Sequence, residues 1–336
     1  MKSVIENSKP SRLPSNRLAD ACLLLVAFIW GINMAVMKMG ITMIDPFAFN
    51  SVRLTLSAMT LGVCVWLEKR RQTSEPSPPL RPHSARSATK KWAVVIAFGL
   101  LSGGFYQIVF AIGMDRTTAG DSALIMSSIP MWTALLAFIF LHENLKKIWI
   151  GLIITFVGTL VVTLQSGGFD FSNENLIGNS IILIAALAWS TGVIISRPLM
   201  KTISPIQLAF YATLGTLPIH YLMAWLFETN GFQHLNQPAI LFCIGYSGIF
   251  STGLAYAMWN YGVHKLGASH ASVFQNLVPL VALAAAWISP LNEKITAIQI
   301  LGGFLIIFGL LVTQKLRTPS DQTQGNKLQR KPKIRK

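Results

Sequence analysis

The sequence predicts an all-α polytopic membrane protein with ten transmembrane helices, arranged as two inverted repeats of five helices each. Three observations predict this fold. First, 52% of the 336 residues are hydrophobic and only 12% are charged, whereas soluble domains carry roughly 25% charged residues. Second, the apolar residues gather in runs long enough to cross a bilayer. Third, one pattern of spaced tryptophan, glycine and proline residues occurs twice along the chain.

Ten apolar runs are long enough to cross the hydrocarbon core of a membrane, which takes about 20 residues of helix. We expect helices because unpaired backbone groups are costly in hydrocarbon, and because the alternating strands of a barrel are missing. The polar segment 68–91 and the tail 317–336 are expected to be disordered. The expected spans are residues 18–38, 46–67, 92–114, 119–141, 148–165, 177–196, 204–227, 239–262, 268–289 and 297–315.

Matched spacings reveal the duplication. Trp30 and Pro46 lie sixteen residues apart, as do Trp189 and Pro205. A second spacing, of seventeen residues, separates Gly113 from Pro130 and Gly262 from Pro279. Because each copy holds five spans, the second copy enters the membrane from the opposite side, and the repeats are inverted about an axis in the membrane plane. The expected domains are a cytoplasmic segment 1–17, repeats 18–165 and 177–316, an extracytoplasmic linker 166–176 and a basic cytoplasmic tail 317–336.

The net charge of +15 is distributed unevenly across the membrane. If the N-terminus is cytoplasmic, nearly all lysines and arginines fall on the cytoplasmic side, and only Arg116 and Lys294 lie fully outside. This positive-inside pattern predicts a multi-pass protein of the cell (inner) membrane with both termini in the cytoplasm. The basic segments are therefore expected to meet the lipid bilayer, with its anionic headgroups, and no nucleic acid.

Two matched sets of residues occur in the two copies. They are residues 118–124, Pro130, 140–144 and 151–158, and residues 261–269, Pro279, 291–294 and 302–309. Together these sets resemble the EamA domain of the drug/metabolite transporter superfamily. The resemblance implies ten helices, a central cavity lined by the third, fourth, eighth and ninth spans, and export of amino acids, other metabolites or drugs. One departure is that Asn292 precedes Glu293 in the second copy, one residue later than the first copy predicts.

Arg53 is a charged side chain expected within the second span. An ionisable group inside a bilayer is costly and needs a partner or a function. One interpretation is a fixed positive charge that faces the cavity and holds a substrate carboxylate. The others are a structural pair, or a side chain that reaches out to the nearby interface.

Asp121 and His270 occupy matched positions at opposite mouths of the fourth and ninth spans. Both are candidates for coupling or gating, because a carboxylate and an imidazole can bind a substrate amine or protons. The alternative for Asp121 is helix capping, since an acidic residue suits the first turn of a helix. Trp30 and Trp189, also matched, are candidates for gating or bracing the site.

Amide, hydroxyl and aromatic residues cluster on the four spans assigned to the cavity. Such groups offer hydrogen bonds and stacking without fixed charge, which suits amphipathic or zwitterionic solutes. The alternative is hydrogen bonding between helices and interfacial aromatic belts. Pro130 and Pro279 are expected to kink their helices, and act either as hinges or only in packing. The candidate cavity residues besides Arg53 are Tyr106, Gln107, Ser127, Ser128, Tyr256, Trp259, Asn260, Gln275 and Asn276.

The function favoured by these observations is a secondary transporter of a small metabolite, working by alternating access at a central cavity and favouring export. The alternatives are a membrane-embedded enzyme and a non-transporting membrane scaffold. An enzyme is disfavoured because the sequence shows no clustered carboxylates, no His/Cys cluster and no phosphate-binding loop. For the same reason no metal and no cofactor is expected, and the three cysteines read as packing residues within spans.

Overall fold

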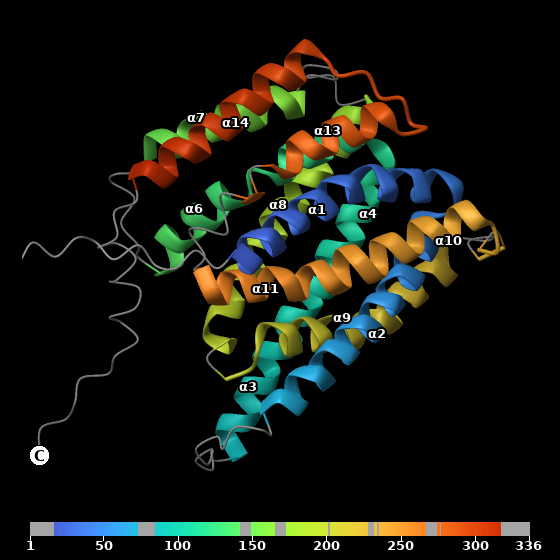
Figure 1. Cartoon of the computed structure of the whole chain (residues 1–336), viewed down its shortest axis with the longest axis vertical. Coiled ribbons are helices and arrows are strands. Elements are labelled where there is room, and N and C mark those ends of the chain that lie inside the picture. The colour runs from blue at the N-terminus through green and yellow to red at the C-terminus, as the bar shows by residue number, and fades with distance from the viewer. Residues whose placement is uncertain are drawn as a thin grey trace, which may run out of the picture.

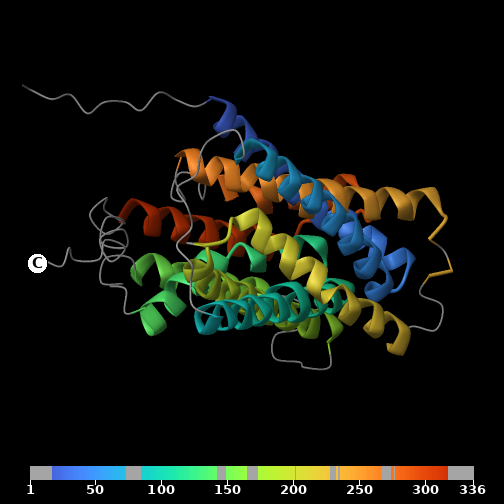
Figure 2. The ribbon, with the colours of Figure 1, turned by 90° about the horizontal axis from the view of Figure 1, so that it is seen from below.

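The structure, a computed structural model, describes residues 17–72, 85–141, 149–164, 173–200, 202–227, 232–233, 235–266, 274–275 and 277–316. These residues form helices joined by short turns, and no strand occurs among them. Figure 2 shows the helices lying side by side along roughly one direction, as helices that cross one bilayer must.

The helices follow one another in the order that the apolar runs predict. The first half contains α1 (Arg17–Met43), α2 (Pro46–Gln72), α3 (Ala85–Phe98), the π-helix η1 (Gly99–Phe105), α4 (Tyr106–Arg116), α5 (Ala119–Met126), α6 (Ile129–Leu141) and α7 (Trp149–Leu164). The second half contains α8 (Glu174–Leu199), α9 (Pro205–Phe227), α10 (Pro238–Gly245), the π-helix η2 (Tyr246–Leu254), α11 (Ala255–Leu266), α13 (Val278–Ile288) and α14 (Ala297–Leu316).

Within the described ranges, six helical stretches are long and apolar enough to cross a membrane. They are α1, α2, α3 to α4, α5 to α6, α8, and α10 to α11. Three shorter apolar helices lie in α7, α13 and α14. The expected seventh span corresponds to α9, which has 23 residues but is not among the six. The ninth expected span is described only as α13 and residues 274–275.

The polar segment 68–91 was expected to be disordered, and this is wrong at both of its ends. Helix α2 continues to Gln72, and α3 begins at Ala85. Two contacts hold the last turns of α2: Ser204 Oγ donates to Glu68 Oε2 at 2.7 Å, and the Arg70 guanidinium lies over the Trp66 ring. Cations also suit the C-terminal turn of a helix. The expectation for residues 73–84, for 1–16 and for the tail falls outside the described residues.

Both central prolines begin a helix. Pro130 is the second residue of α6, after a turn at Ser127 and Ser128, and Pro279 is the second residue of α13. In the first turn of a helix the missing proline N–H costs little. The fourth span is therefore broken into two helices, where the sequence predicted one kinked helix.

Helices of one half pack mainly against helices of the other half. In Figure 1, α7 and α14 lie side by side at one end of the molecule, and α2 and α9 lie towards the other end. Both pairs are antiparallel. In the first, a Cβ added to Gly151 would lie 2.6 Å from the Gly309 oxygen, and one added to Gly158 would lie 2.8 Å from the Gly302 oxygen. Small residues allow such close approach between membrane helices.

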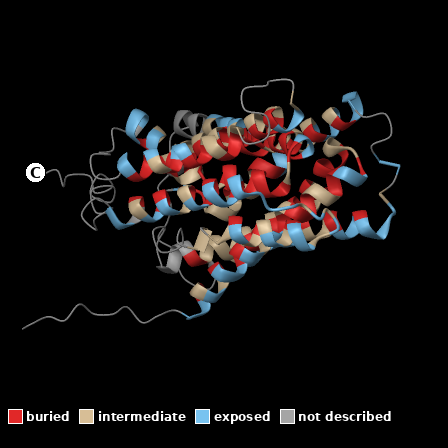
Figure 3. Ribbon diagram, turned by 90° about the horizontal axis from the view of Figure 1, so that it is seen from above, coloured by how far each residue is buried: buried red, intermediate tan, exposed pale blue. Residues whose placement is uncertain are grey.

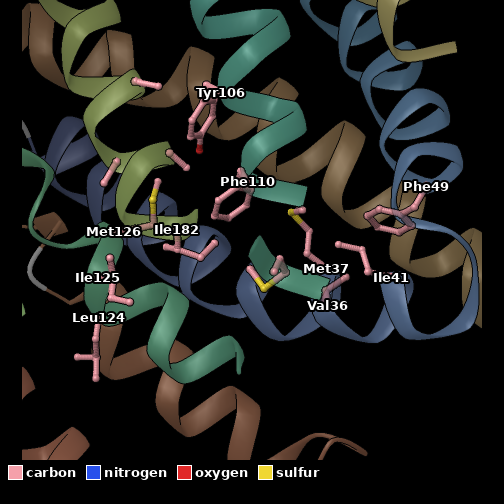
Figure 4. Close-up of a cluster of buried hydrophobic side chains, with 14 of the residues drawn as sticks. Val36, Met37, Ile41, Phe49, Tyr106, Phe110, Leu124, Ile125, Met126 and Ile182 are labelled. Atoms are coloured by element: carbon pink, nitrogen blue, oxygen red, sulfur yellow. The ribbon is translucent and has the colours of Figure 1, made fainter. Parts of the chain in front are cut away.

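Figure 3 shows the exposed residues on the outer parts of the helices and the buried ones towards the middle. Many large apolar side chains are exposed, and many polar ones are buried. Trp225 and Ile288, for example, are 76% and 77% exposed. A surface of this kind suits lipid rather than water. The main apolar core joins α1, α2, α4, α5 and α8; Figure 4 shows Met37, Phe110 and Ile182 meeting there. This core surrounds the polar groups described next.

Candidate functional site

Arg53 lies two turns into α2 with its side chain inside the bundle. It is 3% exposed, and among the lysines and arginines whose side chains the structure describes it alone is buried. Asn50 lies one turn before it on the same face of α2, and Ser57 lies one turn after it. This face points away from lipid, because Asn50 and Ser57 are both fully buried.

All five N–H groups of the Arg53 guanidinium donate hydrogen bonds. Nε and Nη2 both donate to Asn50 Oδ1, with Nε at 3.2 Å, and Nη2 also donates to Gln107 Oε1 at 2.8 Å. Nη1 donates to Thr252 Oγ1 at 3.0 Å and, at 3.5 Å, to Ser247 Oγ. A guanidinium has five such N–H donors, so each of them has an acceptor. Arg53 thus ties α2 and α4 of the first half to η2 of the second.

Every acceptor around Arg53 is a neutral oxygen. Two belong to amides and two to hydroxyls, and no carboxylate pairs with Arg53 in the described part of the chain. Hydrogen bonds lower the cost of burying the cation, but they do not neutralise its charge. Within the described residues, the centre of the bundle therefore carries a fixed positive charge without a counter-ion.

His220 of α9 extends this network as a neutral side chain. Its Nε2 lies 2.7 Å from the Gly103 carbonyl oxygen, and its Nδ1 lies 3.3 Å from Asn50 Nδ2. A carbonyl can only accept, so Nε2 carries the proton and Nδ1 accepts from Asn50. Asn50 Nδ2 also points towards the Gln107 carbonyl oxygen, at 3.4 Å. The helices α2, α4 and α9 and the π-helix η1 are thereby held together around Arg53.

Both π-helices contribute to this centre. Gly103 belongs to η1, while Ser247 and Thr252 belong to η2. π-Helical turns are rare and often occur at functional sites. Glycine permits the close packing here: a Cβ at Gly103 would lie 2.6 Å from the Ala212 oxygen, and one at Gly248 would lie 2.5 Å from the Arg53 oxygen. Close backbone approach brings the hydroxyls of η2 within reach of the guanidinium.

Two pairs of aromatic rings join the two halves. The rings of Trp30 and Trp259 have centroids 5.5 Å apart, and Trp30 Nε1 donates to the Ser251 carbonyl oxygen of η2 at 3.1 Å. The rings of Tyr106 and Trp189 have centroids 4.9 Å apart. The structure thus brings four of the sequence-predicted residues together in two pairs, each joining the two halves.

The remaining candidate cavity residues hold their own helices. Ser127 Oγ and Ser128 Oγ donate to the Leu124 and Ile125 carbonyl oxygens, each at 2.6 Å, where α5 ends. Asn260 Nδ2 donates to the Tyr256 carbonyl oxygen at 2.8 Å, one turn back. Two other candidates, Tyr256 and Gln275, are partly buried, whereas Asn276 and His270 lie outside the described residues.

Asp121 lies in a second polar cluster, at the N-terminus of α5. Thr118 Oγ1 accepts from the Asp121 backbone N–H at 3.0 Å, and Asp121 Oδ1 accepts from Gln299 Nε2 of α14 at 2.9 Å. The carboxylate of Glu293 accepts from the backbone N–H groups of Ala119, at 2.8 Å, and Gly120, at 3.1 Å. Thr118 and Glu293 therefore satisfy the donors of the first turn, while the Asp121 carboxylate bonds a side chain of α14.

The outer ends of neighbouring helices are tied in the same region. Lys38 Nζ donates to the Met114 and Asp115 carbonyl oxygens at 2.8 and 2.7 Å, at the C-terminus of α4. Asn292, the residue by which the second copy departs from the first, has a positive φ of 46°. Asparagine tolerates this left-handed conformation. In the described residues no group of three His, Cys, Asp or Glu side chains comes together that could hold a metal.

Sequence reasoning missed Asn50, Ser247 and Thr252, and it gave His220 no partner. Asn50 carried a usable signal, because it precedes Arg53 by three residues and so shares its helix face. Ser247 and Thr252 carried none, since small hydroxyl residues are common in apolar helices and satisfy themselves on their own backbone. Their role follows only from the approach of η2 to α2.

Comparison with known proteins matches both halves to one family. The sequence profile of the EamA-like transporter family matches residues 17–164 and again residues 176–314. The uncharacterized transporter YoaV of Bacillus subtilis is 24% identical over 292 residues, covering 86% of this chain and 94% of the relative. A protein of Salmonella typhimurium named "Probable amino-acid metabolite efflux pump" is 25% identical over 298 residues. This match covers 86% of this chain and 92% of the Salmonella protein.

The fold also has a counterpart among solved structures. One crystal structure superimposes with a TM-score of 0.60 and 20% sequence identity. The match covers 89% of this chain and 96% of that chain. The arrangement of helices described above is therefore shared with an experimentally determined protein.

Proposed function

The chain belongs to the EamA-like transporter family, and from that premise we propose that it is a secondary transporter which exports a small metabolite by alternating access. The solute class is an amino-acid-like or drug-like compound. It binds at the centre of the bundle, in the region of Arg53, Gln107 and Tyr106. The protein lies in the cell (inner) membrane, and both termini are cytoplasmic.

The observation that carries this proposal is a polar, charged centre built by both halves of an otherwise apolar bundle. Arg53 donates to Gln107 of the first half and to Thr252 of the second. Intramembrane charges generally mark substrate or ion pathways. Transporters built from repeats commonly bind their solute near the midplane, between the repeats and beside irregular helices. The π-helices η1 and η2 are such irregular segments.

Ten helices in two inverted repeats, residues 18–165 and 177–316, form part of the proposal. Support comes from matched packing: α2 packs on η2 while α9 packs on η1, and α1 packs on α11 while α8 packs on α4. The corresponding pairs α2–α9 and α7–α14 are antiparallel, as an axis in the membrane plane requires. In this arrangement Pro130 and Pro279 begin matched helices and act as hinges.

The contacts of Glu293, Asp121 and Lys38 close the extracytoplasmic end in the state described here. Two of these contacts, Glu293 with α5 and Asp121 with Gln299, join the two halves. Alternating access then requires that they break when the site opens outwards. Asp121 contributes to this closure, and any role that Asp121 has in coupling acts through the closure.

The test compares metabolites in the medium of cells that overproduce the protein and cells that lack it. We expect one solute, or a few related ones, to rise in the medium and to fall inside the cells. Proteoliposomes with purified protein should then take up that solute with saturation, whereas protein-free liposomes should not. A membrane enzyme would instead yield a new compound, and a scaffold would change no solute; either result contradicts export.

The relatives' names favour transport over catalysis. YoaV is named as a transporter and the Salmonella protein as an efflux pump for amino-acid metabolites. Those names describe the relatives, and we extend to this chain the idea of a small metabolite leaving the cell. The solute's chemistry is argued separately below.

A further inference from the structure

We propose that Arg53 binds a carboxylate of the transported solute, and that the carboxylate takes the place of Gln107 and Thr252 on the guanidinium. This inference rests on the proposed function. It names the solute class as compounds with one carboxylate, and it excludes simple cations.

The first argument is charge. Arg53 is buried and permanently protonated, and its acceptors are neutral. A charged hydrogen bond to a carboxylate is stronger than one to an amide or hydroxyl. An arriving carboxylate therefore gains more from the guanidinium than the present acceptors do. A cationic solute would meet an uncompensated like charge at the same place.

The second argument is geometry. Asn50 Oδ1 occupies the Nε–Nη2 edge of the guanidinium and fixes it from within the same helix. The Nη1–Nη2 edge is held by Thr252 from η2 and Gln107 from α4, with Ser247 at a longer distance. Two oxygens of one carboxylate match such an edge in the bidentate manner. The Nη1–Nη2 edge, which bonds residues of both halves, is therefore the one to which a solute carboxylate can bind.

The third argument is that neither displaced group is left buried without a partner. Thr252 Oγ1 already donates to the Ser247 carbonyl oxygen at 2.9 Å, so it gives up only its role as an acceptor. Gln107 is partly exposed and can turn its amide. Asn50 is fully buried and holds His220 as well as Arg53, which makes it the poorest candidate for displacement.

Nearby groups favour a single carboxylate over a phosphate. His220 is neutral because its Nδ1 accepts from Asn50 Nδ2 while its Nε2 donates to a carbonyl, so it offers no second positive charge. A dianionic phosphate would keep one charge unbalanced in the interior. The Tyr106 hydroxyl, by contrast, makes no hydrogen bond within the described residues, and Tyr106 precedes Gln107, which accepts from Arg53. It is free to donate to a carboxylate oxygen.

Exchange at Arg53 also links solute binding to movement of the halves. The bonds to Thr252 and Ser247 join the first half to the second, and the carboxylate replaces the shorter of them, the bond to Thr252. Without solute they hold η2 against α2. With solute bound, one of the ties between the halves is released, so the bundle can rearrange around the site.

The test measures binding to full-length protein purified in detergent, by the shift of its thermal melting temperature. The probes are the twenty common amino acids, acetate, lactate and benzoate, and for each stabilising acid its amide, which is isosteric but lacks the negative charge. We expect the acid to bind at least about tenfold more tightly than its amide. Equal binding of acid and amide overturns the proposal, as does a panel in which no carboxylate stabilises the protein.

Variants of Arg53 test whether the acid binds at this residue. Arg53→Gln should weaken binding of the acid by about tenfold or more, and Arg53→Lys, which keeps the charge but loses the fork, by less. The matched control is Arg70→Gln on the same helix, where Arg70 is exposed; it should bind as the wild type does. Acid binding that survives Arg53→Gln unchanged overturns the proposal.

Transport assays separate this inference from the proposed function. If proteoliposomes move a solute that has no carboxylate, and Arg53→Gln moves it equally well, the carboxylate site is wrong while transport stands. If the wild type moves no solute at all, the proposed function itself is wrong. The comparison of acid with amide on the wild type needs no variant, so it remains decisive even where Arg53→Gln fails to fold.

Discussion

At the scale of single residues, Asn50 decides how Arg53 is presented. One amide oxygen accepts from two guanidinium nitrogens, and the amide nitrogen donates to His220. The sequence predicts that Arg53 needs a partner, because a charge in a span is costly. It does not say which of several polar residues supplies that partner, since this depends on side chains three residues and, for Thr252, 199 residues away.

We expect Asn50→Ala to lower the free energy of unfolding by about 2–3 kcal/mol, because it leaves buried donors of Arg53 without an acceptor. The measurement is thermal or denaturant unfolding of the purified protein in detergent. The matched control is Ser57→Ala on the same helix face. Ser57 Oγ is buried and has no hydrogen-bond partner in the part of the chain that the structure describes, so its removal should leave stability unchanged or raise it. Equal losses for the two variants would contradict the network described here.

At the scale of elements, the irregular segments carry the site. The apolar runs predict the helices, and even their order, because a bilayer rewards any sufficiently long apolar helix. Hydropathy does not distinguish a π-helix from an α-helix, so η1 and η2 were not foreseen. Proline was a better signal of irregular helix geometry than hydropathy, because Pro130 and Pro279 lie at the beginnings of α6 and α13. The sequence predicted a kink at Pro130, where the structure has a turn between α5 and α6.

The cap that Glu293 provides for α5 is the contact we expect to control the outer end. Glu293→Ala removes the acceptor of two backbone N–H groups, so it should lower stability by about 1–2 kcal/mol. It should also expose Ser122, which is buried one turn inside α5. A Ser122→Cys variant with Cys22, Cys64 and Cys243 changed to alanine, labelled with a membrane-impermeant thiol reagent, reports this.

Labelling of Ser122→Cys should be slow in the parent and faster once Glu293→Ala is added. The control is Glu174→Ala: Glu174 is an exposed acid in the first turn of α8, where Asn173 supplies the cap. That change should alter neither labelling nor stability. If Glu293→Ala leaves labelling as slow as in the parent, the outer cluster is not a closure.

At the scale of the whole molecule, the two halves fold against each other. Each main helix pair described above joins one half to the other, so neither half buries its polar face alone. Periodic spacings in the sequence predict a duplication, and the family profile matches twice. The inverted orientation of the repeats stays a prediction, and so does the placement of the termini.

The placement of the termini can be measured directly. The excess of lysine and arginine on one side predicts a cytoplasmic C-terminus and an extracytoplasmic linker at 166–176. A green fluorescent protein fused after Lys336 should therefore fluoresce, and alkaline phosphatase fused within the linker should be active. The reversed pair of fusions serves as the control and should be dark and inactive. Fluorescence from a linker fusion would contradict the proposed orientation.

The sequence by itself determined the membrane class, the order of the helices and the presence of an arginine within the second span. These follow from run length and local charge, and the bilayer acts on both without regard to partners. Only the tertiary structure decided that Arg53 meets Asn50, Gln107, Ser247 and Thr252. Those contacts depend on how closely helices from two halves approach, which glycines at 103 and 248 allow, and on the register that the π-helices impose. Neither the distance between these helices nor their register is encoded in any one stretch of the chain.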